Sequence, residues 1–444
     1  MADCLPFMGL MFNLGKIQDF GSVIAPPYDV ISEEEKKRLK NSNPYNIVNL
    51  TLPDEASDSD KYNSASRILS LWIEQGILEP EKKECFYVLE ESFIEDGVNR
   101  SFTGFAGILK IEDYGNKNGV LRHEKTLSKP REDRLNLLKS CRANLEFIYT
   151  LFSDSDRSIG SIIESVKRGT PEISTGASYD ETLHFKLWKI TEEPAVSKIT
   201  ELMKNKTLLI ADGHHRYETS RLYREDLKKS NNGPNGTRPE DYIMSLFVSS
   251  SQDNIIIHPT HRIINFKEKV NLEHIIEKLG VFFSIEKIVS DEKEIAGKMR
   301  RFSEKSLKAV CIIDGNGNCC TAVLKHDLNE CYKKTGLPME GFDPEFEQLD
   351  VNILHKLILS GILRDFPVTE TSFCHTIGEI ITGLQKLSAG EESEGNLHGS
   401  SYGFILNAPD IKTVEGLSQK GLIMPQKSTY FYPKPCSGLI IYKF

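Results

Sequence analysis

An apolar strand that runs straight into a glycine turn and a helix is the feature that most constrains this fold. Residues 207–211 (TLLIA) are predicted to form the strand, Asp212 and Gly213 the turn, and residues 214–229 the helix. A helix start has unpaired backbone N–H groups and partial positive charge, and a glycine lets a ligand approach the backbone closely. The segment therefore predicts an α/β protein with an anion site at this turn.

The first turn of this helix carries an unusual charge pattern. His214, His215 and Arg216 follow one another where acidic side chains are normally preferred. A bound anion would stabilise three cationic side chains there, beside an Asp212 that we expect to be unpaired. The alternative is a polar helix start with one buried, hydrogen-bonded histidine. Tyr217 and Glu218, which come next, are further site candidates.

The adjacent histidines do not predict a metal site made by protein ligands alone. Neighbouring residues on a helix diverge by about 100°, whereas metal-binding pairs favour i, i+4 spacing. The cation we expect is Mg²⁺ carried by a nucleotide, contacted by Asp212 or Glu124.

Three more polar clusters follow predicted strand ends or tight turns, and we predict that they join the glycine turn in one composite site. A carboxylate among cations suits proton abstraction and phosphate binding, although a solvated charged loop explains the first cluster equally well. The candidates in these clusters are His123, Glu124 and Arg134; His261 and Arg262; and Lys427, Ser428 and Thr429.

At 444 residues the chain exceeds the usual size of a single hydrophobic core. We expect an α/β fold with mixed sheets in three regions: 1–155, 156–268 and 269–444. Helices are predicted at 61–75, 159–167 and 194–203, and strands at 85–93 and 100–111 around the turn Glu95-Asp96-Gly97.

Composition narrows the function class. The net charge is −9 and no long Lys/Arg cluster occurs, so nucleic acid is a poor candidate partner. Nine scattered cysteines without C-x-x-C spacing predict reduced thiols and a cytoplasmic location. With neither a signal peptide nor an apolar run of about 18 residues, we expect a soluble protein without a membrane partner.

Seven ordered motifs resemble a largely bacterial family, the domain of unknown function 1015 (DUF1015), over nearly the whole chain. They are APPYDVIS (25–32), NPYN (43–46), HEKT (123–126), KPREDRL (129–135), ADGHHRYET (211–219), PTHR (259–262) and MPQKSTYFYPK (424–434).

The turn Asp212 to Arg216 is also similar to the phosphate-binding turn of the ParB/sulfiredoxin superfamily, whose free-serine kinases carry Asp-Gly-His-His-Arg there. This resemblance implies a ParB/sulfiredoxin-like nucleotide-binding core. It also implies ATP or ADP with Mg²⁺ as phosphoryl donor and a small hydroxyl metabolite, first L-serine, as acceptor. Glu124 would be the base, Asp212 would orient the phosphates, and His214, His215, Arg216 and Lys427 would offset charge. The alternatives are a non-catalytic nucleotide-binding regulatory module and a nucleotide hydrolase.

Overall fold

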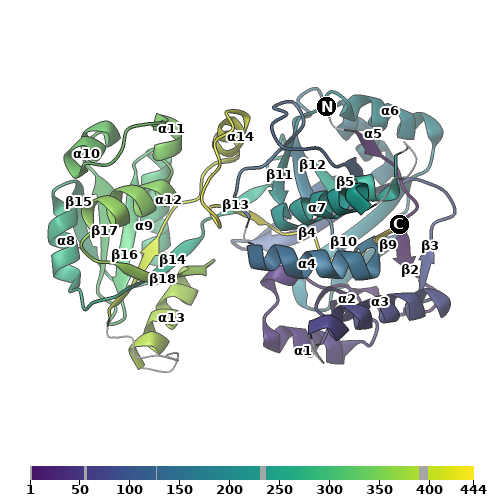
Figure 1. Ribbon diagram of the computed structural model, residues 1–444, viewed down its shortest axis with the longest axis horizontal. Helices are drawn as coiled ribbons and strands as arrows, with labels where there is room; N and C mark the ends of the chain where they lie inside the picture. Colours follow the sequence, from purple (N-terminus) through teal and green to yellow (C-terminus); the bar gives the residue numbers. More distant parts are fainter. Residues whose placement is uncertain (1–2, 55–57, 127, 231–236, 390–398) are drawn as a thin grey trace. The chain divides into compact units, whose positions relative to one another are not determined.

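The chain leaves one folded unit, builds a second, and then returns to the first (Figure 1). The structure is a computed structural model that describes residues 3–54, 58–126, 128–230, 237–389 and 399–444. Unit 1 comprises Met1–Ile256 and Pro433–Phe444, and unit 2 comprises Ile257–Tyr432. Residues 1–155 and 156–256 of the first two predicted regions lie in unit 1, as does the segment from Pro433 onward, and unit 2 starts at Ile257. The division into three regions stays a prediction.

Unit 1 is built on a nine-stranded sheet in the order β6-β11-β8-β12-β5-β4-β10-β9, with β1 pairing β5. Its strands are β1 (Cys4–Leu5), β4 (Phe86–Glu95), β5 (Val98–Lys110), β6 (Val120–Leu121), β8 (Ile148–Phe152), β9 (Ile173–Ala177), β10 (Asp180–Ile190), β11 (Leu208–Asp212) and β12 (Tyr242–Ser249). β6 and β11 run parallel, as do β8 and β12, while the other neighbours are antiparallel. The predicted α/β class with mixed sheets is therefore confirmed.

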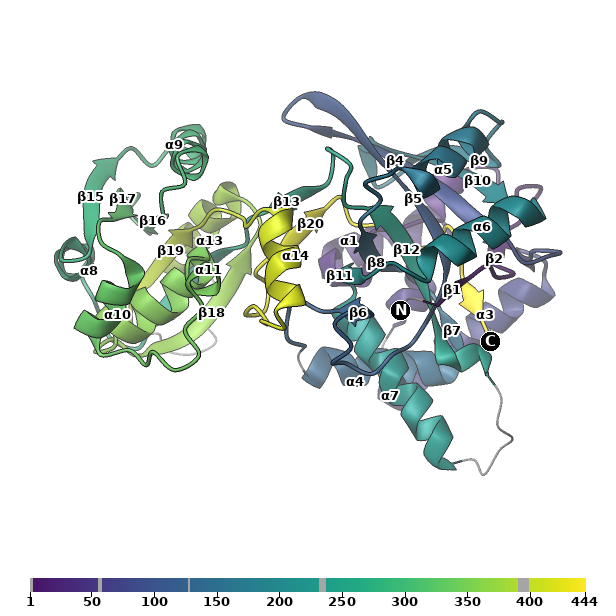
Figure 2. The same ribbon diagram turned by 90° about the horizontal axis from the view of Figure 1, so that it is seen from above.

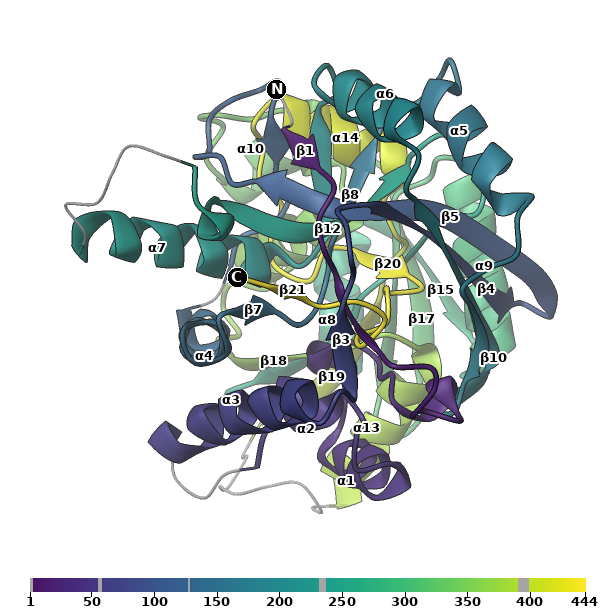
Figure 3. The same ribbon diagram turned by 90° about the vertical axis from the view of Figure 1, so that its right-hand side faces the viewer.

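One face of this sheet is covered by two amphipathic helices, α5 (Ser158–Lys167) and α6 (Glu193–Met203), which lie side by side in Figure 3. Apolar residues at helical spacing, such as Ile159, Ile163 and Ile199, pack against sheet residues including Phe105 and Phe247. Their burial removes apolar surface from water and holds the helices on the sheet.

The remaining helices and short strands of unit 1 surround this sheet. They are α1 (Glu33–Ser42), α2 (Val48–Thr51), α3 (Asp58–Glu74), α4 (Ser128–Cys141), α7 (His214–Ser230), and the pairs β2 (Leu10–Phe12) with β3 (Leu78–Pro80) and β7 (Ala143–Asn144) with β21 (Tyr442–Lys443). Short 3₁₀ helices span Phe20–Ser22, Tyr28–Val30 and Pro239–Asp241. The β7–β21 pair attaches the C-terminal segment to unit 1.

Unit 2 has a six-stranded sheet in the order β15-β17-β16-β19-β14-β18. The strands are β14 (His261–Phe266), β15 (Phe283–Ile288), β16 (Ala309–Asp314), β17 (Cys319–Leu324), β18 (Val368–Cys374) and β19 (Ser401–Ile405). α9 (Glu292–Glu304) and α13 (Ile377–Ala389) contribute to its core, and Figure 2 shows α9 on one side of the sheet and α8 (Leu272–Gly280) and α10 (Leu328–Thr335) on the other. The unit also holds α11 (Pro344–Glu347), α12 (Asp350–Asn352), α14 (Ile411–Gln419), and β20 (Tyr430–Tyr432), which pairs with β13 (Ile256–His258).

Two elements of the C-terminal half are irregular or short. The helix that begins at Asp350 continues after Asn352 as a π-helix, Ile353–Ile362, and the last strand is limited to Tyr442–Lys443. Within the described ranges, no helix combines the length and apolarity needed to span a membrane.

Candidate functional site

The glycine turn has the predicted strand–turn–helix geometry. β11 ends at Asp212, α7 begins at His214, and Gly213 between them has φ +90°, in the left-handed region that favours glycine. A Cβ at this position would lie 3.0 Å from Ile148 Cγ2 and 3.1 Å from Ile148 Cα. Both the backbone angle and the close approach to β8 therefore require glycine here.

Asp212 is paired, contrary to our expectation. Arg216 Nη2 donates to Asp212 Oδ2 over 2.5 Å, and Lys434 Nζ lies 2.9 Å from Asp212 Oδ1. Arg216 also donates through Nη1 to the carbonyl of Phe147. The predicted unpaired carboxylate is thus wrong, because one cation comes from the first turn of α7 and another from the C-terminal segment.

Lys434 bridges two carboxylates. Its ammonium also contacts Asp29 Oδ2, and its side chain is only 7% exposed. Burial opposes the charged form, but Asp212 and Asp29 outweigh that effect and raise the pKa of Lys434. The lysine is therefore a fixed positive charge at the turn.

Glu146 supplies a third carboxylate beside Arg216. Its Oε1 accepts from the backbone N–H of Tyr28 over 3.0 Å and from Ser437 Oγ over 2.9 Å. Burial works to lower the pKa of Arg216, but Glu146 and then Asp212 outweigh it and raise that pKa. A cavity of about 50 Å³, lined in part by Arg134, Glu146 and Arg216, adjoins this network and has room for little more than water.

The structure brings His123 and Glu124 to the glycine turn. β6 and β11 are parallel neighbours, with Leu208 opposite Val120 and Leu209 opposite Leu121, so residues following both strands emerge at one edge. The ring centroids of His123 and His214 lie 4.6 Å apart, and Glu124 Oε1 is 3.6 Å from His123 Nε2. A base candidate far away in the sequence therefore lies next to the turn.

His214 is buried, and its Nε2 has no hydrogen-bond partner within the part of the chain that the structure describes. Burial first, and then His123, lower the pKa of His214 well below its usual value. Burial thus favours the neutral imidazole, and the predicted role of His214 in offsetting phosphate charge stays a prediction. His215, the next residue, is half-buried.

Arg134 was predicted to bind phosphate, but its donors are engaged within the protein. The buried guanidinium donates to Asp133 Oδ2 (Nε, 2.9 Å) and to the Thr51 carbonyl (Nη1, 2.8 Å). It also lies 4.2 Å from the centroid of the Tyr28 ring. Arg134 therefore positions Tyr28, the residue before Asp29.

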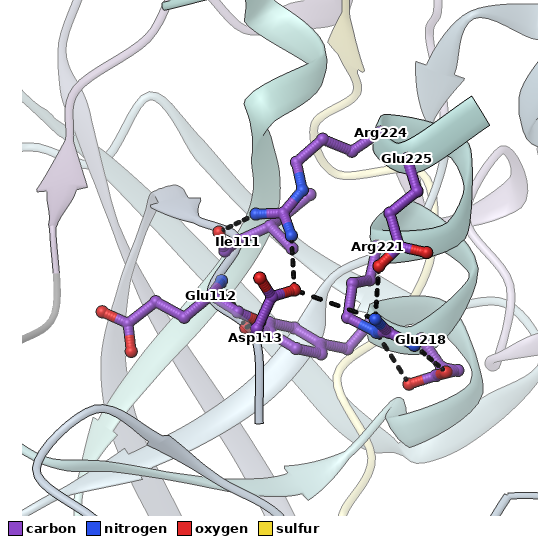
Figure 4. Close-up of polar contacts among 8 residues, drawn as sticks. Ile111, Glu112, Asp113, Glu218, Arg221, Arg224 and Glu225 are labelled. Atoms are coloured by element: carbon purple, nitrogen blue, oxygen red, sulfur yellow. Dashed lines mark hydrogen bonds and ion pairs between the residues drawn. The ribbon is translucent and has the colours of Figure 1, made fainter. Parts of the chain in front are cut away.

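Tyr217 and Glu218 anchor α7. The hydroxyl of Tyr217, which is buried, donates to the carbonyl of Glu112 over 3.0 Å and accepts from its N–H over 2.9 Å. Glu218 pairs with Arg221 at 2.9 Å, and Figure 4 shows Arg221 and Arg224 directed toward Asp113. Tyr217, Arg221 and Arg224 thus join α7 to the segment after β5. A site role for Tyr217 and Glu218 stays a prediction.

The remaining candidates lie in unit 2. Arg262 is fully buried and donates through Nη2 to the carbonyl of Lys427 over 2.7 Å, so the PTHR and KST motifs meet within that unit. His261 Nδ1 accepts from the N–H of Leu406 over 3.3 Å, and burial, followed by Arg262, lowers the pKa of His261 to about 3. Ser428 Oγ donates to the Pro425 carbonyl over 2.6 Å, and Thr429 is half-buried. Their participation in one composite site stays a prediction.

Sequence reasoning did not select Asp29, Glu146 and Lys434 as site residues. Asp29 and Lys434 lie inside the APPYDVIS and MPQKSTYFYPK motifs, which was an available signal. Glu146, between apolar residues, had no such signal.

Several solved structures are similar to this chain. A mutant free serine kinase in complex with AMP is 12% identical, with a TM-score of 0.32, over 71% of this chain and 85% of that one. Another mutant free serine kinase, in complex with ADP, is 12% identical with a TM-score of 0.31 over 71% and 84%. SbnI with a C-terminal truncation, from Staphylococcus aureus, is 10% identical with a TM-score of 0.33 over 73% and 85%. No curated protein matches the chain.

The family expected from the seven motifs is confirmed by its model, described as "Protein of unknown function (DUF1015)", which matches residues 4–352. This chain belongs to the DUF1015 family.

Proposed function

We propose that this protein is a phosphotransferase that moves a phosphoryl group from ATP or ADP to a small hydroxyl compound, with free L-serine as the first acceptor to test. The observation that carries the proposal is the placement of Glu124 beside the glycine turn. The turn offers phosphate-binding groups, and Glu124 is a carboxylate that could accept the proton of an attacking hydroxyl. Phosphoryl transfer needs both functions in one place.

The phosphate-binding groups come from the start of α7. Backbone N–H groups in the first turn of a helix have no intrahelical acceptor, so they can donate to a phosphate. Arg216 and Lys434 hold two positive charges at this turn, and each is paired with Asp212. Nε2 of His214, which has no partner among the described residues, can donate to a phosphate oxygen when it carries the proton.

Magnesium would arrive with the nucleotide. Among the described residues no group of three or more His, Cys, Asp or Glu side chains is placed to hold a metal ion. Both oxygens of Asp212 already face cations, so this carboxylate fits a water-mediated contact with a phosphate-bound Mg²⁺ better than direct ligation. The ion would neutralise phosphate charge.

Glu124 fits the role of general base. Its side chain is 13% exposed, which leaves the carboxylate both accessible and partly desolvated, and His123 lies beside it. A positioned base typically contributes about 10²–10⁴-fold to the rate.

The test is to incubate the full-length protein with Mg²⁺, ATP or ADP, and L-serine, and to measure phosphoserine by mass spectrometry. We expect product from the wild type, a loss of about 10²–10⁴-fold in kcat for Glu124→Gln, and full activity for the exposed control Glu181→Gln. The absence of phosphorylated product from L-serine and from a panel of small hydroxyl compounds would reject the proposal. Nucleotide binding without turnover, unaffected by Glu124→Gln, would instead support a non-catalytic nucleotide-binding module.

A further inference from the structure

Unit 1 contains a second, larger cavity at the opposite edge of its sheet. The cavity has a volume of about 480 Å³ and is lined by Phe152 and Ser249, the final residues of the parallel strands β8 and β12. Because β11 runs antiparallel to β8, the glycine turn lies at the other edge. Ligands of α/β proteins commonly bind at the carboxyl ends of parallel strands, in pockets of about 300–1,000 Å³.

The floor of this cavity is apolar and its walls are fixed. Phe152, Ile159, Ile163 and Phe247 form the floor and belong to the core between the sheet and α5. On one wall, the Gln252 side chain accepts from the N–H of Thr103 over 2.9 Å and donates to the carbonyl of the same residue over 2.8 Å. These contacts hold the cavity in shape without a ligand, which lowers the entropic cost of binding.

Two of the four charged side chains around the cavity are engaged within the protein. Asp154 accepts from the N–H groups of Ile159 (3.3 Å) and Gly160 (2.8 Å). Glu164 forms an ion pair with Lys167 at 3.3 Å. Neither carboxylate needs a ligand to balance its charge.

The other two, Arg157 and Asp253, differ from them. Within the described ranges, neither side chain takes part in an ion pair or a hydrogen bond, and both are exposed at the rim. Arg157 comes from the turn before α5, where its φ of +54° is unusual for a residue with a side chain, and Asp253 comes from the turn after β12. One positive and one negative group thus stand at the mouth of a cavity with an apolar floor.

We infer that this cavity binds a small zwitterion with an apolar body, namely a free amino acid with an apolar side chain. Arg157 receives the carboxylate, Asp253 receives the ammonium group, and the side chain of the ligand covers the apolar floor. Charge-assisted hydrogen bonds of this kind are stronger than neutral ones and orient the ligand. The site is separate from the glycine turn, and its existence does not depend on phosphotransfer.

Calorimetry on the full-length protein tests this with four probes: L-leucine, L-phenylalanine, leucine amide and N-acetyl-leucine. We expect saturable binding of at least one amino acid, and binding at least about 10-fold weaker for its derivatives, since each lacks one charged group and tenfold corresponds to about 1.4 kcal/mol. Arg157→Gln should weaken the binding of L-leucine but leave the affinity for leucine amide unchanged, because the amide has no carboxylate. Asp253→Asn should weaken the binding of L-leucine but leave the affinity for N-acetyl-leucine unchanged, because the acetylated compound has no ammonium group.

Two further variants complete the experiment. Arg168→Gln removes an exposed arginine just after the same helix and should leave every affinity unchanged. Ser251→Trp places a large ring in the cavity from its rim and should abolish binding. The inference is overturned if neither amino acid binds at millimolar concentration or if the Ser251→Trp variant still binds one of them. It is also overturned if Arg157→Gln and Asp253→Asn bind L-leucine with the affinity of the wild type.

Discussion

Lys434 Nζ lies 2.9 Å from Asp212 Oδ1, so a residue of the C-terminal segment completes the charge balance of a turn more than two hundred positions earlier. The same ammonium contacts Asp29, and Arg216 holds the other oxygen of Asp212. Acidic and basic side chains therefore alternate in a group of four at the glycine turn: Asp29, Lys434, Asp212 and Arg216. This group orients the carboxylate and keeps two cations at the start of α7.

Removing this lysine is expected to destabilise unit 1. Lys434→Met leaves Asp212 and Asp29 partly buried without a shared cation, a type of change that typically costs about 3–5 kcal/mol. Lys139→Met is the matched control, because Lys139 pairs with Asp226 at 2.7 Å on the surface, where such pairs contribute about 0–1 kcal/mol. Denaturant unfolding measures both variants. Equal losses would show that the Lys434 pair behaves as a surface pair.

Gly213 should tolerate alanine less well than a glycine with a similar backbone angle. Gly213→Ala adds a Cβ at 3.0 Å from Ile148 Cγ2, whereas Gly97→Ala, at φ +73°, meets nothing within 4 Å. Both changes carry the cost of a left-handed alanine, about 1–3 kcal/mol. We expect a larger loss of unfolding free energy for Gly213→Ala, and the difference reports the contact with β8. If thermal unfolding shows the same shift for both, the close approach has no energetic effect.

Protonation of His214 should make the protein acid-sensitive. Burial, followed by His123, lowers the pKa of His214 in the folded state, while in the unfolded chain a histidine titrates near about 6.5. The stability that this group contributes is therefore present above pH 6.5 and is lost as pH falls, by up to about 1.4 kcal/mol per pH unit. His214→Gln should flatten the decline in unfolding free energy between pH 6.5 and 5. The exposed control His274→Gln should keep the wild-type slope, and an unchanged slope in His214→Gln would contradict the assignment.

Glu91 should have the opposite pH dependence. It is fully buried in β4, neither carboxyl oxygen has a hydrogen-bond partner within the described ranges, and burial raises its pKa well above the usual value. Because the folded-state pKa is raised, stability is highest below the unfolded pKa of about 4.3 and falls as pH rises through the folded pKa. Glu91→Gln should therefore be more stable than the wild type at pH 8, by a margin that shrinks toward pH 5. A margin that does not change with pH would mean that Glu91 is not the titrating group.

Local patterns in the sequence predicted most elements of unit 1. Alternation around Glu95-Asp96-Gly97 predicted the hairpin of β4 and β5, and helical spacing of apolar residues predicted α5 and α6. The apolar run before Asp212 predicted β11 and the start of α7. These elements were predictable because their burial pattern repeats over neighbouring residues.

The charge pattern of the site was not predictable in the same way. Asp212 looked unpaired because Lys434 and Asp29 reach it only after distant segments of unit 1 fold together. His214 looked cationic because burial against His123 depends on the pairing of β6 with β11. The pKa of a side chain depends on its three-dimensional neighbours, and residue order contains little information about them.

The return of Pro433–Phe444 to unit 1 has a consequence for synthesis on the ribosome. Translation proceeds from the N-terminus, so Asp29 and Asp212 emerge long before Lys434, and all of unit 2 is made in between. Until Lys434 is made, the first unit of a nascent chain therefore lacks the cation that joins Asp29 to Asp212, and a product of premature termination within unit 2 would never acquire it.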